Sequence, residues 1–274
     1  MRPTVISKST PRGGFGNRVL SYLSLRHVAA ANYVDYRSVN SSDSDLISGI
    51  NRRPFLPLAL TRFQEISAAD ISTDGGPDLV TSVLSEGKSL IIRGAMLGET
   101  FARFAAPASD LAIKNRAQLC QVHRKRAPGK NLVTVHMRAG DFRTWDSNAI
   151  LPAEYYITAI KRVEEDFAPL KIRICIDDAT HPGLADTEKY IRQRGLERAE
   201  LDCLSPFECD FAAMASSRVL ISSPSTFAVC AGLLGTPEVI HNRAWVNNRI
   251  SRNEMFWEKV MLNELPGYRV LGIF

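Results

Sequence analysis

The chain has 274 residues, of which 45% are hydrophobic and 23% are charged, a composition that indicates a globular protein and excludes a disordered or collagen-like one. Lys and Arg total 34 against 29 Asp and Glu, and the resulting net charge of +5 suits an anionic ligand without requiring one. Five cysteines without CxxC spacing argue against a disulfide framework or a zinc site, and no apolar window of 18 residues predicts a membrane span.

The N-terminal part of the chain begins with a strand, a glycine-rich turn and a helix. The β-branched run "PTVISKS" (3–9) predicts the strand, and "VLSYLSLRHVAAANYV" (19–34) has the apolar spacing of a helix. A further strand is predicted at "KSLIIRGAM" (88–96), whereas residues 37–85 have no clear periodicity. The basic run "HRKRAPGK" (123–130) lacks interleaved aromatic residues, so we interpret it as a solvated linker rather than a nucleic-acid site.

Strands and helices alternate regularly in the rest of the chain. The predicted strands are 132–138, 171–177, 199–205, 218–223 and 237–242, and the predicted helices are 152–167, 187–195, 206–217, 226–235 and 252–265. This alternation predicts a mostly parallel sheet with helices on both faces. Because the alternation starts, fades and resumes after residue 126, we expect two α/β domains, residues 1–126 and 127–274, with a final helix able to pack back on the first.

Two polar clusters lie where a helix is about to begin, at strand ends where open α/β sheets bind their ligands. The glycines of "RGGFGNR" (12–18) let the backbone approach a ligand, and the following helix N-terminus can hold a phosphate. The alternative is a tight turn, because the spacing is neither GxGxxG nor a P-loop. In "ISSPSTFAV" (221–229), hydroxyls and amides form a second anion-binding turn, with N-capping by Ser225 or Thr226 as the alternative.

Two further clusters follow predicted strands directly. In "HMRAGD", Arg138 offers a planar fork for a phosphate and His136 can donate or accept toward a nucleotide. Asp141 is a candidate base, or it holds Arg138 or a loop amide, and a buried Arg–Asp pair that stabilises a loop is the alternative for this cluster. In "CIDDAT", Asp177 and Asp178 could bind a metal, act as acid and base, accept the N–H groups of a guanine, or cap the next helix.

The four clusters together suit a nucleotide diphosphate held in a cleft. They supply two helix N-termini that can bind a phosphate, one arginine guanidinium and one acidic group, all at predicted strand ends. The sequence contains no HExxH, CxxC, EF-hand or GxSxG pattern that would favour another chemistry.

Five segments resemble, in the same order, motifs of the α-1,2-fucosyltransferases and related GDP-fucose-dependent glycosyltransferases. They are "GGFGN" (13–17), "VHMRAGDF" (135–142), "LPAEYYITAI" (151–160), "ICIDD" (174–178) and "LISSPSTFAVCAGLLG" (220–235). The resemblance implies a GT-B fold, two facing Rossmann-like domains with a cleft between them and the donor in the second. It implies inverting transfer of fucose from GDP-fucose to a glycan hydroxyl, without a metal or a cofactor.

The resemblance also implies roles for single residues. Arg138 would bind the β-phosphate and stabilise departing GDP, His136 would contact the nucleotide, and Asp177 or Asp178 would bind the guanine. Ser225, Thr226 and Phe227 would line the phosphate and the sugar, whereas Gly14, Gly16 and Asn17 would approach the pyrophosphate from the first domain. Arg138, Asn17 and Asp141 are thus the candidate catalytic residues, and Asp141 has a structural role as its alternative.

The chain departs from the family pattern at a few motif positions. Arg18 replaces a glutamine, Ala139 replaces an arginine, and Ala228 and Val229 replace tryptophans. These departures leave two alternatives, a transferase that uses another GDP-hexose and a non-catalytic nucleotide- or partner-binding α/β protein. An internal ion pair at Arg138 would favour the latter. We expect a cytoplasmic protein with reduced thiols, a GDP-sugar donor and a glycan or glycolipid acceptor, without nucleic acid, and peripheral membrane association stays open.

Overall fold

The fold is given by a computed structural model in which the chain forms two compact units. The described residues are 3–7, 15–32, 35–38, 62–93, 131–145, 147–167, 170–199, 206–235, 237–242, 258–260 and 268–273. The N-terminal unit takes Met1–Leu119, Ser251–Lys259 and Leu265–Gly267, and the C-terminal unit takes Cys120–Ile250, Val260–Glu264 and Tyr268–Phe274. Gly14, the linker at 123–130 and the predicted boundary after residue 126 lie outside the described residues, so these predictions remain predictions.

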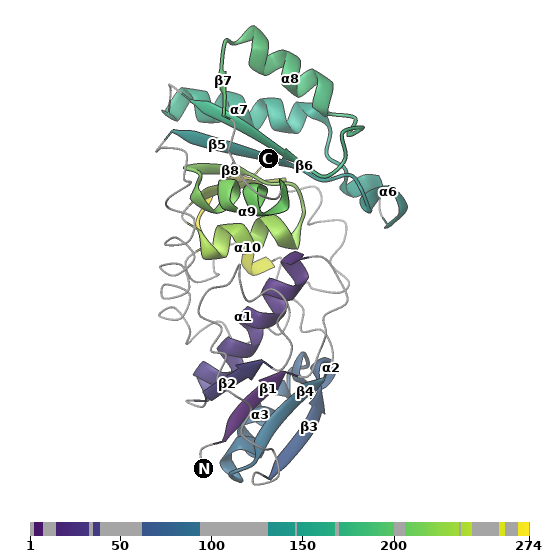
Figure 1. The fold of residues 1–274 in the computed structure, drawn as a ribbon, viewed down its shortest axis with the longest axis vertical. Coiled ribbons are helices and arrows are strands. Elements are labelled where there is room, and N and C mark those ends of the chain that lie inside the picture. Colours follow the sequence, from purple (N-terminus) through teal and green to yellow (C-terminus); the bar gives the residue numbers. More distant parts are fainter. Residues whose placement is uncertain are drawn as a thin grey trace. The chain divides into compact units, whose positions relative to one another are not determined.

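The N-terminal unit contains a parallel sheet with the strand order β2-β1-β4-β3 (Figure 1). Its strands are β1 (Thr4–Ser7), β2 (Asp35–Ser38), β3 (Phe63–Ser67) and β4 (Ser89–Arg93), and its helices are α1 (Phe15–Ala31), α2 (Ala68–Ile71) and α3 (Gly76–Ser85). Buried Val5, Leu90 and Ile92 pack with Val28 of α1 and Val80 of α3 in one core. The strands predicted at 3–9 and 88–96 are therefore confirmed.

Helix α1 begins earlier than its apolar spacing predicts. It starts at Phe15 rather than at residue 19, so Gly16 and Asn17 lie in its first turn and not in a loop before it. The first backbone N–H groups of a helix have no partner within the helix, so poor helix formers such as glycine and asparagine cost little there. The glycine-rich motif thus supplies the helix start itself.

The C-terminal unit contains a second sheet, of parallel strand pairs, with the order β10-β9-β8-β5-β6-β7. The strands are β5 (Leu132–Met137), β6 (Lys171–Ile176), β7 (Glu197–Arg198), β8 (Val219–Ile221), β9 (Glu238–His241) and β10 (Val270–Ile273). The helices are α6 (Phe142–Trp145), α7 (Ala153–Phe167), α8 (Leu184–Gln193), α9 (Pro206–Ser216) and α10 (Thr226–Leu234), with a 3-10 turn η3 (Ser147–Ala149). Helices α7 and α8 lie on one side of the sheet, and α9 and α10 on the other (Figure 1).

This strand order places a topological switch between β5 and β8. The chain runs outward from β5 through β6 to β7 on one side, and from β8 through β9 to β10 on the other. Every residue of β5 is buried, as expected for a central strand covered on both faces. In such sheets ligands bind outside the carboxyl ends of the strands at the switch, so the residues after β5 and β8 occupy the position where a ligand is expected.

Several boundaries differ from the sequence predictions. The two-residue β7 was not predicted and ends just before the strand predicted at 199–205, of which only residue 199 is described, outside any strand. Helix α8 begins at Leu184 rather than at 187, and β10 was not predicted. Among the described strands, β10 pairs with β9 alone at the edge of the sheet, and its register shifts between Val270 and Gly272, so its pairing is irregular. Of the predicted helix at 252–265, only residues 258–260 are described.

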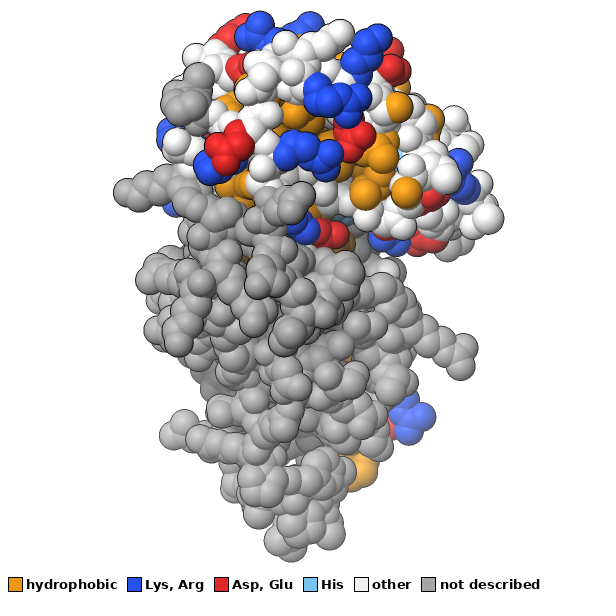
Figure 2. Space-filling model, turned by 45° about the horizontal axis from the view of Figure 1, so that its top comes forward, with side chains coloured by type: hydrophobic (Ala, Val, Ile, Leu, Met, Phe, Trp, Pro, Cys, Tyr) orange, Lys and Arg blue, Asp and Glu red, His pale blue; other side chains and the backbone are white. Residues whose placement is uncertain are grey.

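The surface of the described C-terminal unit carries mixed charges. In the face that Figure 2 presents, Lys and Arg side chains lie beside Asp and Glu side chains, with hydrophobic side chains between them. The positive excess of the sequence is therefore not gathered into one expanse on the described part of this face. Among the described residues, no helix combines the length and the apolar character needed to cross a membrane.

Helix α7 is held on the sheet by apolar packing and by the hydroxyl group of one tyrosine. Its apolar face packs on Val133, Val135 and Ile172 in the core between α7 and the sheet. The buried Tyr155 hydroxyl lies 2.8 Å from the carbonyl oxygen of Ser222 and 3.0 Å from that of Ile240, so it ties α7 to the ends of β8 and β9. The neighbouring Tyr156 hydroxyl is also buried, but it has no hydrogen-bond partner among the described residues.

The two tyrosines of α7 therefore give a matched pair of predictions. Tyr155→Phe should lower the free energy of unfolding by about 1–2 kcal/mol, because it removes the donor that satisfies the buried Ser222 carbonyl. Tyr156→Phe should leave stability unchanged or raise it, because the lost hydroxyl makes no described bond. Urea unfolding followed by circular dichroism measures both, and equal losses in the two variants would contradict this account of α7.

Candidate functional site

The loops after β5 and β8 are joined to each other at the switch point. The Ser223 backbone N–H donates to the carbonyl of His136, at 3.2 Å, and the Ser223 hydroxyl lies 2.7 Å from Nδ1 of His136. Burial, together with the nearby Arg138 and His181, lowers the pKa of His136 to about 3. The imidazole is therefore neutral at physiological pH and forms a fixed polar contact at the base of the site.

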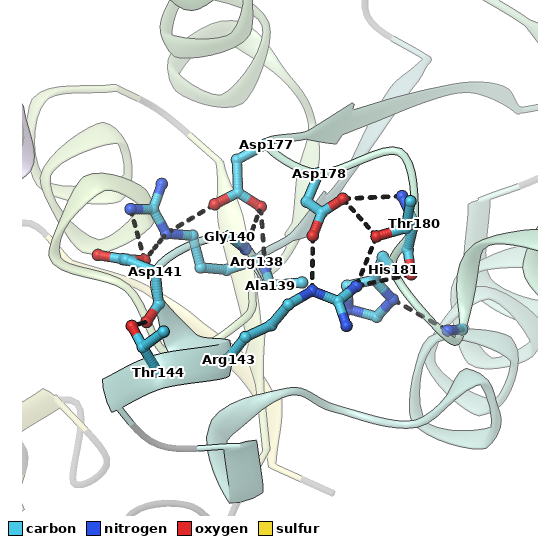
Figure 3. A network of polar contacts seen from close by, with 11 residues as sticks. Arg138, Ala139, Gly140, Asp141, Arg143, Thr144, Asp177, Asp178, Thr180 and His181 are labelled. Carbon is cyan, nitrogen blue, oxygen red and sulfur yellow. Dashed lines mark hydrogen bonds and ion pairs between the residues drawn. The ribbon is translucent and has the colours of Figure 1, made fainter.

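Arg138 follows β5 and is held by two carboxylates (Figure 3). Its Nε lies 3.0 Å from Oδ2 of Asp177, which follows β6. Its Nε and Nη2 also lie 3.0 Å and 2.9 Å from a single oxygen, Oδ1 of Asp141. The guanidinium, whose side chain is 28% exposed, thus sits at the carboxyl edge of the sheet with its charge already balanced.

Asp177 also fixes the loop that carries Arg138. Its Oδ1 accepts the backbone N–H of Ala139 at 2.8 Å and that of Gly140 at 3.4 Å. A Cβ atom on Gly140 would lie 2.7 Å from Oδ2 of Asp177, closer than non-bonded atoms can come. A side chain at position 140 would therefore push the carboxylate away from the backbone, which gives the glycine of the motif a local structural reason.

Arg143 of α6 joins the same region to the loop after β6. Its Nε donates to Oδ2 of Asp178 at 2.7 Å, and its Nη2 donates to both the carbonyl and the hydroxyl oxygen of Thr180, each at 2.7 Å. The Thr180 hydroxyl and backbone N–H in turn donate to Oδ1 of Asp178. These bonds, from Thr180 first and then Arg143, hold the pKa of Asp178 well below its usual range.

The sequence reasoning did not single out Arg143, Thr180, Tyr156 or His181. His181 is buried, its Nδ1 accepts the N–H of Gly183 at 3.0 Å, and its Nε2 has no partner among the described residues. Its ring lies edge-on to Tyr156 with centroids 5.8 Å apart. The only signal for this group was the D-x-T spacing of Asp178 and Thr180, which favours an Asp side chain that accepts a backbone N–H two residues on.

The other predicted residues divide between the two units. Ser225 caps α10 by accepting the N–H of Phe227 at 3.2 Å, and Thr226 is the first residue of that helix. The Phe227 ring lies 6.0 Å from that of His136, so the segment from Ser225 to Phe227 adjoins the end of β5. Gly16 and Asn17 belong to the N-terminal unit. The structure therefore brings the C-terminal candidates together at one sheet edge, and their roles remain predictions.

Comparison with known proteins supports the fold and leaves the family open. No protein-family model matches the chain, and no curated protein matches it in sequence. Among solved structures, a substituted form of Arabidopsis thaliana FUT1 in complex with GDP has a TM-score of 0.51 at 11% identity, covering 87% of this chain and 70% of that chain. POFUT1 in complex with GDP-fucose has a TM-score of 0.46 at 12% identity, covering 85% and 94% of the two chains.

A third solved structure is E. coli heptosyltransferase WaaC with ADP-2-deoxy-2-fluoro heptose. It has a TM-score of 0.42 at 10% identity, covering 89% of each chain. The Arabidopsis likeness and the two parallel sheets establish the fold class: the chain has a GT-B fold built from α/β units, as the sequence predicted.

The contact between Gly140 and Asp177 gives a prediction at the site. Gly140→Ala should destabilise the C-terminal unit by about 1–3 kcal/mol, because the added Cβ forces the carboxylate away from the loop amides. Gly75→Ala is the control, since a Cβ there meets nothing within 4 Å, and its effect should stay within about 0.5 kcal/mol. Urea unfolding measures both, and a Gly140→Ala variant as stable as the control would refute the required close approach.

Two buried histidines make the free energy of unfolding depend on pH. Burial lowers the pKa of His241 to about 4, and that of His136 lies near 3, whereas both rise to about 6.5 on unfolding. Unfolded chains therefore bind protons that folded chains do not, and the free energy of unfolding should decrease as pH falls below about 6.5. Histidine NMR should show no titration of either ring between pH 8 and 5, with ordinary titration in urea. A midpoint near 6.5 in the folded chain would contradict the buried, neutral assignment.

Proposed function

We propose that the chain is a glycosyltransferase that transfers fucose from GDP-fucose to a hydroxyl group of a glycan. The observation that carries this proposal is the position of Arg138, a partly exposed guanidinium at the topological switch of a parallel sheet in a chain with the GT-B fold. The Arabidopsis structure that shares this fold is a complex with GDP, which supports a GDP-linked donor.

The chemistry of sugar transfer needs groups of this kind. Breaking the bond between the sugar and the diphosphate places negative charge on the departing nucleotide, and fixed positive groups that bind this charge lower the barrier. Arg138 supplies a full charge and a planar fork. The N-terminus of α10, which begins at Thr226 on the same edge of the sheet, supplies oriented backbone dipoles. We propose that the reaction needs no metal, since these groups provide the charge that a metal would otherwise supply.

The ion pairs of Arg138 favour a second candidate, a nucleotide-binding protein without transfer activity. In the structure Arg138 is engaged by Asp141 and Asp177. However, the Asp141 side chain is 64% exposed, and ion pairs of this kind contribute about 0–1 kcal/mol. A diphosphate that binds the guanidinium with two charge-assisted hydrogen bonds can outcompete such a pair. The existing pair therefore describes the ligand-free state and is compatible with donor binding.

The carboxylates after β6 constrain how a guanine could be bound. Guanine presents two neighbouring donors, which a carboxylate accepts best with one lone pair on each oxygen. Oδ1 of Asp177 already accepts two backbone N–H groups, and Oδ1 of Asp178 accepts the N–H and the hydroxyl of Thr180. With two lone pairs on each oxygen, either residue could accept one guanine donor through Oδ2. We therefore propose a single carboxylate contact to the base.

Calorimetric titration with GDP, ADP, UDP and GDP-fucose, with and without EDTA, tests the donor site. Wild-type protein should bind GDP and GDP-fucose best, and EDTA should change nothing. Arg138→Ala should weaken binding about ten- to a hundredfold, because a hydrogen bond to a charged group contributes about 1.5–3 kcal/mol. Arg162→Ala, which removes an exposed arginine from ion pairs on α7, is the control and should bind like wild type.

Activity assays separate the two candidate functions. The transferase proposal expects wild-type protein to transfer fucose to one member of a glycan panel, or to hydrolyse GDP-fucose slowly in its absence, and expects Arg138→Ala to lose both. Tight GDP binding with neither reaction would favour the binding protein. Equal binding of GDP by Arg138→Ala and wild type would sink the transferase proposal, which takes Arg138 as the phosphate-binding group.

A further inference from the structure

The two carboxylates that hold Arg138 differ in exposure and in their other contacts. The Asp177 side chain is 22% exposed and is anchored to the backbone of Ala139 and Gly140. The Asp141 side chain is 64% exposed, and among the described residues its carboxylate pairs with Arg138. One carboxylate is thus built into the loop, while the other lies at the surface.

Asp177 fixes the direction of the guanidinium. Its Oδ1 accepts the loop amides, and its Oδ2 forms an ion pair with Arg138, 3.0 Å from Nε, while the Nε–H itself donates to Asp141. The close approach allowed by Gly140 keeps the carboxylate in this position. Because none of these loop contacts needs a ligand, they can persist when an anion binds the two Nη groups of Arg138.

Asp141 occupies part of the surface of Arg138 that an anion would use. A single oxygen of Asp141 takes both Nε and Nη2, which is how one phosphate oxygen binds along an edge of a guanidinium. Releasing this carboxylate costs little, because it is already largely solvated. Its presence nevertheless places a negative charge where the diphosphate must come.

We propose that Asp177 is a positioning residue that aims Arg138 at the donor diphosphate, and that Asp141 is an internal anion which the diphosphate displaces. This inference rests on the proposed function in taking Arg138 as the phosphate-binding group. It assigns opposite effects on anion affinity to the two carboxylates, and it gives Asp141 a function other than that of a general base.

The test measures the affinity of the full chain for inorganic pyrophosphate and for GDP by calorimetry. Asp141→Asn should tighten the binding of both by roughly three- to fivefold, the size expected when an exposed ion pair no longer competes. Asp177→Asn should weaken the binding of both ligands by about tenfold or more, because the Arg138 guanidinium is no longer held in its orientation. The asparagine oxygen can still accept the loop amides. Glu165→Gln is the matched control, since Glu165 is 69% exposed and also pairs with an arginine three residues away.

Opposite signs distinguish this inference from general charge repulsion. If both carboxylates only repelled anions, Asp141→Asn and Asp177→Asn would both tighten binding, and the inference would be overturned. Glu165→Gln should change neither affinity, and a tightening in this control equal to that of Asp141→Asn would likewise assign the effect to net charge.

A double-mutant cycle shows whether Asp177 acts through Arg138. In an Arg138→Lys background, Asp177→Asn should have little further effect on pyrophosphate affinity, because the group that it positions is already replaced. If its effect is undiminished, Asp177 acts on the loop alone and the positioning role is wrong. Circular dichroism of each variant confirms that it is folded before its affinity is compared.

The choice of probes separates this inference from the proposed function. Binding of pyrophosphate with the expected signs, without binding of GDP, would uphold the roles of the carboxylates and reject a GDP-sugar donor. If wild-type protein binds no pyrophosphate at millimolar concentration, Arg138 is not an anion site and the inference is overturned. Binding of both ligands with unchanged affinities in the two Asp variants overturns the inference and leaves the proposed function standing.

Discussion

The contact of the Asp177 carboxylate with Arg138 and with the amides of Ala139 and Gly140 is the constraint on which the site depends. It joins the ends of β5 and β6, two neighbouring parallel strands, through a side chain rather than through the ladder of backbone bonds. Without it, two loop amides would lose an acceptor and the partly buried guanidinium would lose an ion-pair partner at the sheet edge, which is costly for partly desolvated groups. Gly140 suits this contact, because a Cβ at that position would lie 2.7 Å from Oδ2 of Asp177 and force the carboxylate to shift.

The site is more rigid toward the core than toward solvent. At its base, Tyr155 holds the ends of β8 and β9, and the neutral His136 ring bonds the Ser223 hydroxyl, all in buried positions. At the sheet edge, Asp177 fixes one side of Arg138, and the solvated Asp141 occupies the other. This decrease in burial from the base of the site to the sheet edge matches what binding of a charged donor requires. The guanidinium is preorganised by groups that need not move, and the group that must move is the one whose release costs least.

The sequence predicted elements with strong periodicity and residues that follow them directly. Strand β5 was predictable because it gives a buried apolar run, β6 because its isoleucines alternate with other residues, and α7 because it has an apolar face. Arg138 and Asp177 directly follow these two strands. The partners of these residues were not predictable in detail. Nothing in the spacing of Arg143 and Asp178 shows that helix α6 and a loop 35 residues further along the chain would meet. The orphaned Tyr156 hydroxyl and the two-residue β7 depend on tertiary packing, which leaves no local pattern.

A crystal structure of the chain with GDP tests the central claim most directly, because it shows which atoms bind the diphosphate. The account predicts the β-phosphate on the Nη groups of Arg138, with Asp141 turned to solvent and Asp177 still on Nε and the loop amides. GDP bound elsewhere, with the Arg138–Asp141 pair intact, would contradict it.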